Sequence, residues 1–493
     1  MQKVQKVVIA GGGTAGWIAA ATLSSQLGSL IDITLVESAD IATVGVGEAT
    51  IPTHKAFHRL IGVDEQAFMR KTQATFKLGI EFNDWGNIGE RYFHSFGQIG
   101  RSTWMGDFQH LWQHANTLGW GGELQDYCFE LQAAKAGKFA NDSKTNVNYA
   151  YHLDAGLYAS FLRDFSQQRG VKRIEGTIER IEMDSENGHI SHLILRNGTR
   201  VSGDLFIDCT GFKGLLINGA LGVGFADWSH WLPMNSAWAV QTEGMQPIPP
   251  YTKSFAHDAS WQWRIPLQNR VGNGLVFCSD YTSEQEALAL LTDNIEGNML
   301  SQPRLLTFKT GKRKKAWFKN CVAMGLASGF LEPLESTSIH LSQIAATRLV
   351  QMFPFNGMDE TLQTHYNTYV DGEVNSIRDF IILHYTLNRR PEPFWQHVAT
   401  MAIPDSLKHR MELYTKTSIA FKNDADLFRV DSWNQVMLGQ GIKVEGYHQM
   451  GRLVANDNLR KAFNELQAHI KTAVDEMPLH ADFLRQYDVL SHQ

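Results

Sequence analysis

The sequence has few cysteines, no surplus of positive charge and no unbroken hydrophobic run of membrane-spanning length. The cysteines lie far apart and form no CxxC pair, which argues against a disulfide framework and a zinc site: Cys128, Cys209, Cys278 and Cys321. Lys and Arg number 45 against 51 Asp and Glu, a net charge of −6. The chain therefore has no global electrostatic reason to hold DNA, RNA or an anionic membrane.

The apolar segment Val7–Leu23 is similar in composition to a signal peptide. Four glycines interrupt it, and no small-residue cleavage site follows at the expected place. The sequence therefore predicts a cytoplasmic protein. Its 493 residues, 43% hydrophobic and 19% charged, exclude a disordered chain and allow about three domains or one large two-part enzyme.

The first forty residues predict a βαβ unit. Lys6–Ala10 is a short buried run typical of a central parallel strand, Gly11–Gly16 forms a turn, Trp17–Leu27 has a helical composition, and Ile31–Val36 is a second strand.

Further along, residues 150–170 are predicted to be helical up to Gly170. The dipeptides Asn187-Gly188 and Asn197-Gly198 predict two hairpin turns, and residues 204–209 predict a buried strand that runs into a glycine turn.

More strand-like segments follow at Ser236–Thr242, Trp261–Leu267 and Leu275–Cys278, the last after a predicted turn at residues 272–274. From His340 onward the pattern is mainly helical, with breaks near Pro391 and Pro404. There is no internal repeat and no low-complexity linker, and the segments are interleaved.

The motif Gly11-x-Gly13-x-x-Gly16 predicts a dinucleotide site. Gly11 permits a tight turn, Gly13 lets the backbone approach a pyrophosphate, and Gly16 lets helix and strand pack closely. The helix N-terminus then faces the phosphates. Glu37, about 20 residues after the last glycine, can accept a hydrogen bond from a ribose hydroxyl. The alternative is a glycine turn without a ligand.

The motif alone does not select FAD over NAD. Only one such fingerprint is present, so an enzyme built on it has to receive reducing equivalents from outside or bind NAD(P)H transiently.

Three further stretches carry a resemblance: residues 45–52 (GVGEATIP), residues 261–266 (WQWRIP) and residues 330–337 (FLEPLEST). Together with the glycine motif, this set resembles the flavin-dependent halogenases of the tryptophan-halogenase family. The resemblance implies an α/β fold with a flavin monooxygenase-like (GR2-type) FAD-binding module and a mainly α-helical substrate module. We predict the FAD module at 1–215 and 300–350, a β-rich segment at 216–299 and the helical module at 351–493.

The resemblance also implies a reaction. Family members use FADH2 and O2 to make a flavin C4a-hydroperoxide, which halide attacks to give hypohalous acid. The oxidant then passes through an internal tunnel to a lysine beside the aromatic substrate. A separate NAD(P)H-dependent flavin reductase supplies the FADH2. Bromide is more easily oxidised than chloride, so we expect bromination to be at least as easy as chlorination. A monomer or a homodimer is expected.

Two residues match the family's catalytic pair. Lys77, in Phe76–Phe82, matches the lysine that hydrogen-bonds or polarises the hypohalous acid or forms a haloamine. Glu335 matches the glutamate that orients the oxidant and accepts the arenium proton, with Glu332 less favoured. The alternatives are a surface lysine and an acid that stabilises a helix N-terminus.

Thr337 and Ser338 match the backbone amides that hold halide in the family. Many members have glycine where this chain has Ser338, and serine would be strained there if the backbone needed a positive φ. Further positions match flavin contacts or belong to the glycine turn, although each is also compatible with ordinary packing: Thr14, Ala15, Ala49, Ile178, Leu326 and Ile339.

Trp261, Trp263 and Ile265 share one face of a strand and precede Pro266. In the family this motif keeps organic substrate away from the flavin, and core packing is the alternative. His94 and Phe96 match a pair that sandwiches an indole, but His94 could equally be a core histidine. The 19 histidines show no metal-ligand spacing, so we predict no metal.

Tryptophan-specific members close over the amino acid with a C-terminal lid whose residues are missing from 410–460. We therefore predict a more open pocket for an indole-type substrate other than tryptophan. Two other functions stay open. A flavin-dependent aromatic hydroxylase (monooxygenase) shares the fold but should lack Lys77 and the tryptophan motif. A flavin- or nucleotide-binding sensor or scaffold without turnover should lack Lys77 and Glu335 but keep the glycine motif.

Overall fold

The computed structural model describes residues 3–40, 47–103, 106–142 and 145–490. They form two compact units, each built from three separate stretches of the chain. The first unit comprises Met1–Ala74, Leu153–Ser236 and Leu306–Asn375, and the second comprises Thr75–His152, Ala237–Leu305 and Ser376–Gln493. The two units are therefore interleaved along the chain.

A six-stranded sheet forms the centre of the first unit, in the order β20-β21-β12-β1-β2-β8. All neighbouring pairs are parallel except β20 with β21. The strands are β1 (Lys6–Ala10), β2 (Asp32–Glu37), β8 (Lys172–Glu175), β12 (Leu205–Asp208), β20 (Trp317–Phe318) and β21 (Cys321–Ala323). The predicted βαβ opening is confirmed, although helix α1 (Thr14–Leu27) begins before Trp17.

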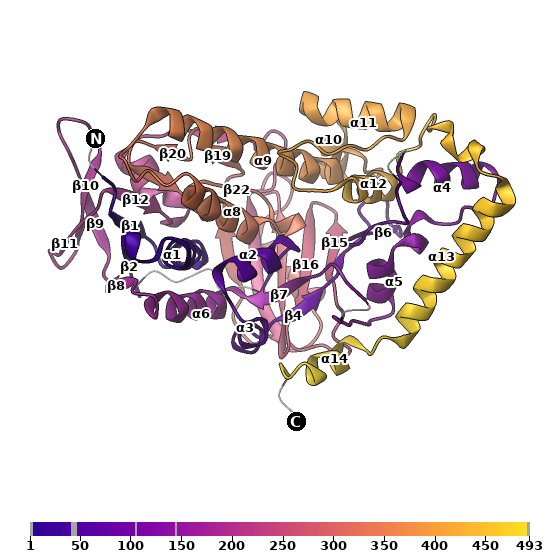
Figure 1. Ribbon diagram of the computed structural model, residues 1–493, viewed down its shortest axis with the longest axis horizontal. Coiled ribbons are helices and arrows are strands. Elements are labelled where there is room, and N and C mark those ends of the chain that lie inside the picture. Colours follow the sequence, from indigo (N-terminus) through magenta and orange to yellow (C-terminus); the bar gives the residue numbers. More distant parts are fainter. Residues whose placement is uncertain (1–2, 41–46, 104–105, 143–144, 491–493) are drawn as a thin grey trace. The chain divides into compact units, whose positions relative to one another are not determined.

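Helix α1 is mostly buried because α6 (Ala155–Gln167) and α8 (Ser338–Gln351) pack against it (Figure 1). The predicted helix over 150–170 is wrong at its start. Residues Ala150–Asp154 form strand β7, and the helix begins only after Asp154, whose carboxylate accepts the backbone N–H of Leu157 as an N-cap. Helices α2 (Thr53–Ile61) and α3 (Glu65–Thr72) complete this part of the unit.

Both predicted hairpins are present in a three-stranded antiparallel sheet of β9 (Ile178–Met183), β10 (Ile190–Leu195) and β11 (Arg200–Ser202). Gly188 and Gly198 have φ values of 66° and 82°, the left-handed conformation that such turns require. A second small sheet contains β13 (Phe225–Asp227), β19 (Gly311–Arg313) and β22 (Gly329–Phe330).

A larger sheet of mostly antiparallel strands forms the centre of the second unit, in the order β18-β14-β17-β16-β15-β5-β6. Its strands are β5 (Gly79–Asn83), β6 (Arg91–Ser95), β14 (Ser236–Glu243), β15 (Thr252–His257), β16 (Ser260–Pro266), β17 (Arg270–Phe277) and β18 (Arg304–Thr307). The short strand β4 (Thr75–Lys77) pairs antiparallel with β7.

The predicted turn at residues 272–274 is wrong, because these residues lie inside β17. Gly274 is opposite Trp263 in the register of β16 and β17, and a Cβ at position 274 would collide with the indole ring. The glycine therefore provides room for a tryptophan, whereas its sequence context is typical of a turn.

The described chain after His340 is mainly helical, as predicted. Helix α9 (Glu360–Thr386) ends before Pro391, α10 (Pro393–Thr400) ends before Pro404, and α11 (Asp405–Thr417) follows. The second unit also contains α4 (Phe108–Thr117), α5 (Phe129–Lys135), α7 (Glu284–Asp293), α12 (Val430–Gly439), α13 (Asn456–Glu476) and α14 (His480–Gln486). The long α13, yellow in Figure 1, packs against α5.

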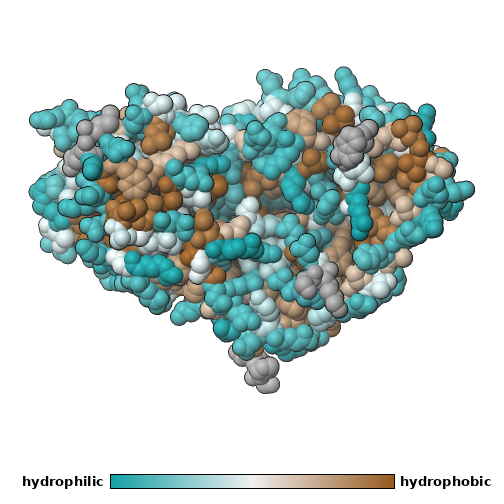
Figure 2. All heavy atoms as spheres, in the orientation of Figure 1, coloured by the Kyte–Doolittle hydropathy of each residue, from teal (hydrophilic) through white to brown (hydrophobic). Residues whose placement is uncertain are grey.

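None of the described helices is long and apolar enough to cross a membrane. On the face drawn in Figure 2, hydrophilic side chains surround separate hydrophobic areas. Within the described ranges, no group of three or more His, Cys, Asp or Glu side chains is arranged to hold a metal ion.

Candidate functional site

The glycine turn of the first unit connects β1 to α1 and requires its glycines. Gly11 has a φ of 108°, and a Cβ there would collide with the backbone carbonyl of Cys209 at the end of β12. A Cβ at Gly16 would collide with the carbonyl oxygen of Gly11. Gly13 precedes α1 in extended conformation, and α1 has neither a side-chain cap nor an acid in its first turn. The turn thus leaves the N-terminus of α1 suited to an anion.

Glu37, the last residue of β2, lies directly over this turn. A Cβ at Gly12 would run into its carboxylate. The indole N–H of Trp17 donates to Oε2 at 3.2 Å, and the guanidinium of Arg173 from β8 pairs with Oε1. Both contacts fix the carboxylate beside the turn and leave each oxygen a second lone pair for a ribose hydroxyl.

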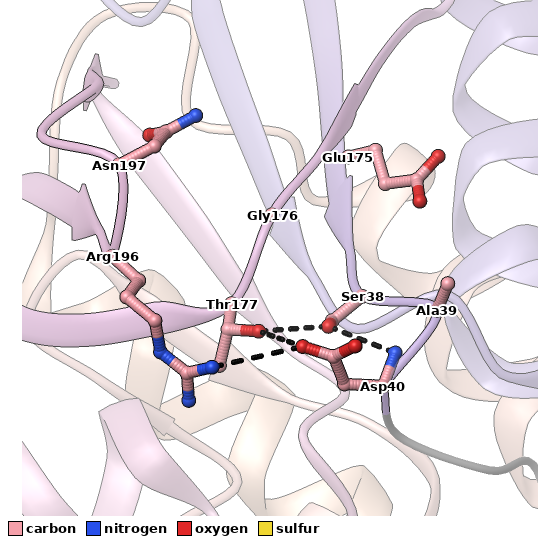
Figure 3. Close-up of a pocket in the computed structure, with 8 residues that line it drawn as sticks. All are labelled: Ser38, Ala39, Asp40, Glu175, Gly176, Thr177, Arg196 and Asn197. Atoms are coloured by element: carbon pink, nitrogen blue, oxygen red, sulfur yellow. Dashed lines mark hydrogen bonds and ion pairs between the residues drawn. The ribbon is translucent and has the colours of Figure 1, made fainter.

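A cavity of about 450 Å³ begins immediately after Glu37. Its walls come from the residues after β2, the end of β8 and the β10–β11 turn: Ser38, Ala39, Asp40, Glu175, Gly176, Thr177, Arg196 and Asn197 (Figure 3). The hydroxyls of Ser38 and Thr177 are 2.8 Å apart, and Thr177 donates to Asp40 at 3.3 Å. The cavity therefore has a polar, hydrogen-bonded wall at the carboxyl end of the parallel sheet, where such folds bind ligands.

The other predicted flavin contacts lie in the same unit. Leu326 belongs to the 3₁₀ turn Gly325–Ala327, and a Cβ at Gly325 would lie 2.5 Å from Cβ of Ala15 in the first turn of α1. Ile339 is buried in the first turn of α8, which packs on α1. Ile178 begins β9. The Leu326 turn and α8 thus lie against α1, the helix that follows the glycine turn.

The motif over residues 45–52 is described only from Gly47, because Gly45 and Val46 lie outside the described residues. Ala49 is buried at the end of β3 (Gly47–Ala49). Burial raises the pKa of the neighbouring Glu48 carboxyl to about 7, so this acid is partly protonated at neutral pH.

Glu335 ends the 3₁₀ turn Pro333–Glu335, directly before α8. Glu332, Glu335 and Thr337 are all at most 1% exposed, and the Thr337 hydroxyl has no hydrogen-bond partner among the described residues. The residue with positive φ in this turn is Ser336, at 59°. Ser338 is the first helical residue of α8, so serine is not strained there. A buried hydroxyl and a helix N-terminus are thus combined in a place that suits an anion.

A buried charged network that no sequence motif indicates lies next to this turn, around His340 in α8. Nδ1 of His340 lies 2.9 Å from the Thr53 hydroxyl, and its Nε2 lies 2.9 Å from Glu373. Arg348 donates to the other Glu373 oxygen at 2.5 Å. Burial raises the pKa of Glu373, but His340 and Arg348 outweigh burial and the net shift is downward. The carboxylate therefore stays ionised and ties α8 to α9 and to the start of α2.

Lys77, at the end of β4 in the second unit, is fully buried. Its Nζ lies 5.2 Å from the centroid of the Phe96 ring, in cation–π range. The His94 and Phe96 rings are 6.3 Å apart in an edge-to-face arrangement, and both side chains are buried. The structure therefore brings Lys77 together with Phe96, and Phe96 together with His94.

Further aromatic rings from α9, α12 and the segment just before α12 extend this group. His94 lies 5.3 Å from Phe380 and 5.9 Å from Phe428, and the Phe380 and Phe428 rings stack at 3.8 Å. Trp433 packs edge-on to Phe380, and its indole N–H has no hydrogen-bond partner among the described residues. No local sequence pattern indicates that these residues lie beside His94. The aromatic residues within 426–434 are the sequence feature that could have suggested it.

The residues of the tryptophan motif are buried in β16. Trp261 packs against Trp85 and Trp263, with ring centroids 6.1 and 5.9 Å apart. Trp263 and Ile265 are 8% and 7% exposed, so the motif is part of the core of the second unit. The carbonyl of Pro266 accepts a 2.7 Å hydrogen bond from the Thr75 hydroxyl, two residues before Lys77.

A parallel sheet with a glycine turn at a strand end, next to a polar cavity, defines a dinucleotide-binding α/β enzyme fold. Comparison with known proteins identifies the family within this class. The family model for tryptophan halogenase matches residues 6–456. The chain belongs to the tryptophan halogenase family, and it is a flavin-dependent halogenase.

Curated relatives include tryptophan 6-halogenase SttH of Streptomyces toxytricini, 36% identical over 83% of both chains. Tryptophan 7-halogenase RebH of Lentzea aerocolonigenes is 32% identical over 98% of this chain and 99% of that protein. Among solved structures, the flavin-dependent halogenase Xcc4156 of Xanthomonas campestris is 50% identical over 99% of both chains, with a TM-score of 0.97. BrvH, a flavin-dependent halogenase from Brevundimonas sp. BAL3, is 40% identical over 98% of this chain and 99% of that chain, with a TM-score of 0.94.

Proposed function

We propose that the protein uses reduced FAD, O2 and bromide or chloride to halogenate an indole-type aromatic substrate, with Lys77 as the catalytic lysine. The observation that carries the proposal is the complete burial of Lys77 beside Phe96. Full burial of a lysine is rare, because desolvation of its ammonium is costly. The aromatic neighbours provide the apolar surroundings that a flat substrate needs.

Residues of the first unit fit FAD. The N-terminus of α1, with Gly13, Thr14 and Ala15, would hold the pyrophosphate, and Glu37 would hold the ribose. The cavity beyond Glu37 would receive the adenosine end. When bound, reduced FAD together with O2 supplies the oxidising equivalent that converts halide into hypohalous acid. The proposed modules are FAD-binding at 1–215 and 300–350, β-rich at 216–299 and helical substrate-binding at 351–493.

Thr337 and Ser338 would hold the halide. The buried hydroxyl of Thr337 has a proton to donate and no acceptor among the described residues, and the first backbone N–H groups of α8 point the same way as the positive end of the helix dipole. We expect bromide and chloride both to bind, because a hydroxyl and helix N-terminal amides attract either anion.

In the proposed transfer, Lys77 hydrogen-bonds the hypohalous acid and polarises its oxygen–halogen bond. An electron pair of the aromatic ring forms the carbon–halogen bond as the halogen–oxygen bond breaks, and the oxygen leaves as water by taking a proton from the Lys77 ammonium. Lys77 regains a proton from solvent when the ring proton has been released. The ring then loses the proton of the substituted carbon to the Glu335 carboxylate. The net products are a halogenated arene and water.

The aromatic group of His94, Phe96, Phe380, Phe428 and Trp433 supports an indole-type substrate. The tryptophan-binding lid pattern is missing from 410–460, which favours indoles without the amino-acid head group. Rates with indole and with tryptophan test this directly, and a clear preference for tryptophan would contradict it. A separate flavin reductase is the proposed source of FADH2.

The decisive experiment combines FAD, a generic flavin reductase, NADH, O2 and bromide with a panel of indoles and identifies products by mass. We expect brominated products from the native protein and none from Lys77→Met, while a soluble diketone trap still detects hypobromous acid. Lys461→Met, which replaces an exposed lysine of α13, is the matched control and should behave like the native protein. Oxygenated products without halogen would favour the hydroxylase, and normal bromination by Lys77→Met would exclude the proposed role.

A further inference from the structure

The strand that carries Lys77 is too short to hold itself in place. β4 contains three residues, Thr75 to Lys77, and all three are fully buried. Only β7 pairs with it among the described strands of the second unit, with Thr75 opposite His152 and Lys77 opposite Ala150. Thr75 and Lys77 point to the same face, because side chains alternate along a strand. A group that fixes Thr75 therefore also fixes the direction in which Lys77 leaves the strand.

The Thr75 side chain bridges two other parts of the second unit. Its hydroxyl donates to the carbonyl of Pro266, the last residue of the tryptophan motif, at 2.7 Å, and it lies 3.1 Å from Nδ1 of His152. A hydroxyl has a single proton, and a carbonyl can only accept. The Thr75 oxygen must therefore accept the N–H of His152 Nδ1.

His152 is thus a neutral imidazole with its proton on Nδ1. Its Nε2 lies 2.9 Å from the Thr252 hydroxyl, which donates to it. Burial, together with the positive charge of nearby Lys77, keeps the pKa of His152 well below its usual value. The chain of hydrogen bonds from Thr252 through His152 and Thr75 to Pro266 is complete, and each donor along it has one acceptor.

The backbone on either side of Lys77 is also held. The N–H of Phe76 donates to Nε2 of His480 at 3.2 Å, and the N–H of Leu78 donates to the carbonyl of Pro250 at 2.7 Å. His480 in turn donates from Nδ1 to the carbonyl of Ile248 at 3.0 Å. These contacts fix the path of the backbone, and the hydrogen bond from Thr75 to Pro266 connects the side-chain face of Lys77 to the tryptophan motif.

We propose that Thr75 and His152 are positioning residues for Lys77, and that the carbonyl of Pro266 gives the tryptophan motif a second task as the anchor of the lysine strand. This inference rests on the proposed role of Lys77. A displacement of about 1 Å in a catalytic group can cost on the order of a hundredfold in rate. Without the hydrogen bonds of Thr75, the strand still contains Lys77, but the ammonium is no longer held at one position.

Thr75→Val and Thr75→Ser form the test pair. Valine keeps the shape of threonine and removes the hydroxyl, whereas serine keeps the hydroxyl. We expect Thr75→Val to lower the yield of halogenated indole per reduced flavin at least about tenfold, while hypohalous acid captured by a soluble diketone rises by the amount not used. Thr75→Ser should stay within about twofold of the native yield. Labelling of Lys77 by an amine reagent, followed by peptide mass spectrometry, should be faster in Thr75→Val.

A purely structural role predicts something different. In that case Thr75→Val lowers the melting temperature, but the folded protein keeps its native yield and its native labelling rate at Lys77, and the proposal is overturned. If Thr75→Val does not fold, His152→Asn and His152→Leu replace the pair, because asparagine retains an N–H near the position of Nδ1 and leucine does not. The proposal requires the yield to fall in His152→Leu and to be rescued in His152→Asn.

Lys77→Met separates this inference from the function on which it rests. Loss of product in Lys77→Met with an unchanged yield in Thr75→Val refutes the positioning role alone. A native yield in Lys77→Met refutes the proposed function, whatever Thr75→Val does.

Discussion

His480 makes the second unit sensitive to mild acid. The side chain is fully buried, and burial lowers the pKa of its imidazole from 6.5 to about 4. Its Nδ1–H already donates to the carbonyl of Ile248, and its Nε2 accepts the backbone N–H of Phe76. A second proton would have to go on Nε2, where it would face another donor. Protonation therefore breaks the contact that holds the lysine strand.

The sign and size of the effect follow from this shift. Because the folded-state pKa is lower than the unfolded-state value, the unfolded chain takes up the proton first as the pH falls. The contribution of His480 to the free energy of unfolding is fully present above pH 6.5 and is lost as the pH falls toward 4. At about 1.4 kcal/mol for each pH unit between 6.5 and about 4, the free energy of unfolding falls by roughly 3 kcal/mol.

The measurement compares native protein and His480→Gln by urea unfolding at several pH values between 7 and 4. Glutamine does not titrate, so the stability advantage of the native protein should shrink by roughly 3 kcal/mol over this range. Hydrogen exchange at the Phe76 amide should quicken over the same range in the native protein. His469→Gln, at an exposed position of α13, is the matched control. An advantage that is the same at pH 7 and pH 4 would refute the reasoning.

Two other substitutions test the first unit. Glu335→Gln keeps the shape of a buried side chain and removes its basicity, so halogenated product should form on the order of a hundredfold more slowly, as measured by mass spectrometry under halide saturation; an unchanged rate contradicts its role as proton acceptor. Gly16→Ala places a Cβ against the carbonyl of Gly11 and should abolish FAD binding in a fluorescence titration, whereas Gly219→Ala, whose Cβ has no neighbour nearer than 4.0 Å, should leave FAD binding intact.

The local elements of the fold were predictable because their causes are local. A buried β-branched run, a glycine turn and an alanine-rich segment predict β1, its turn and α1 wherever the rest of the chain goes. Asn-Gly dipeptides do the same for the β9–β10–β11 hairpins. The prediction failed at β7 and at residues 272–274, where a partner strand and the ring of Trp263, both distant in sequence, decide the conformation.

The site residues divide in the same way, into those that a local sequence pattern predicts and those that only the fold brings together. Spacing and motif placed Lys77, Glu335 and the glycine turn among the candidates, since each lies within a short recognisable string. No string connects Phe76 to His480, which is 404 positions away and accepts its backbone N–H. Likewise, nothing near His94 in the sequence indicates that Phe380 and Phe428 stack beside it.

By itself, the sequence determined most of the short strands, turns and helices, and which residues have the chemistry for a nucleotide, an anion and an electrophile. Propensity, hydrophobic period and turn stereochemistry act over a few residues and need no knowledge of the fold. Only the tertiary structure decided that the lysine is buried, that Thr75 joins it to Pro266 and that His152 has its proton on Nδ1. Those properties depend on which groups exclude water and supply hydrogen-bond partners, and in a chain of interleaved units these groups come from residues hundreds of positions apart.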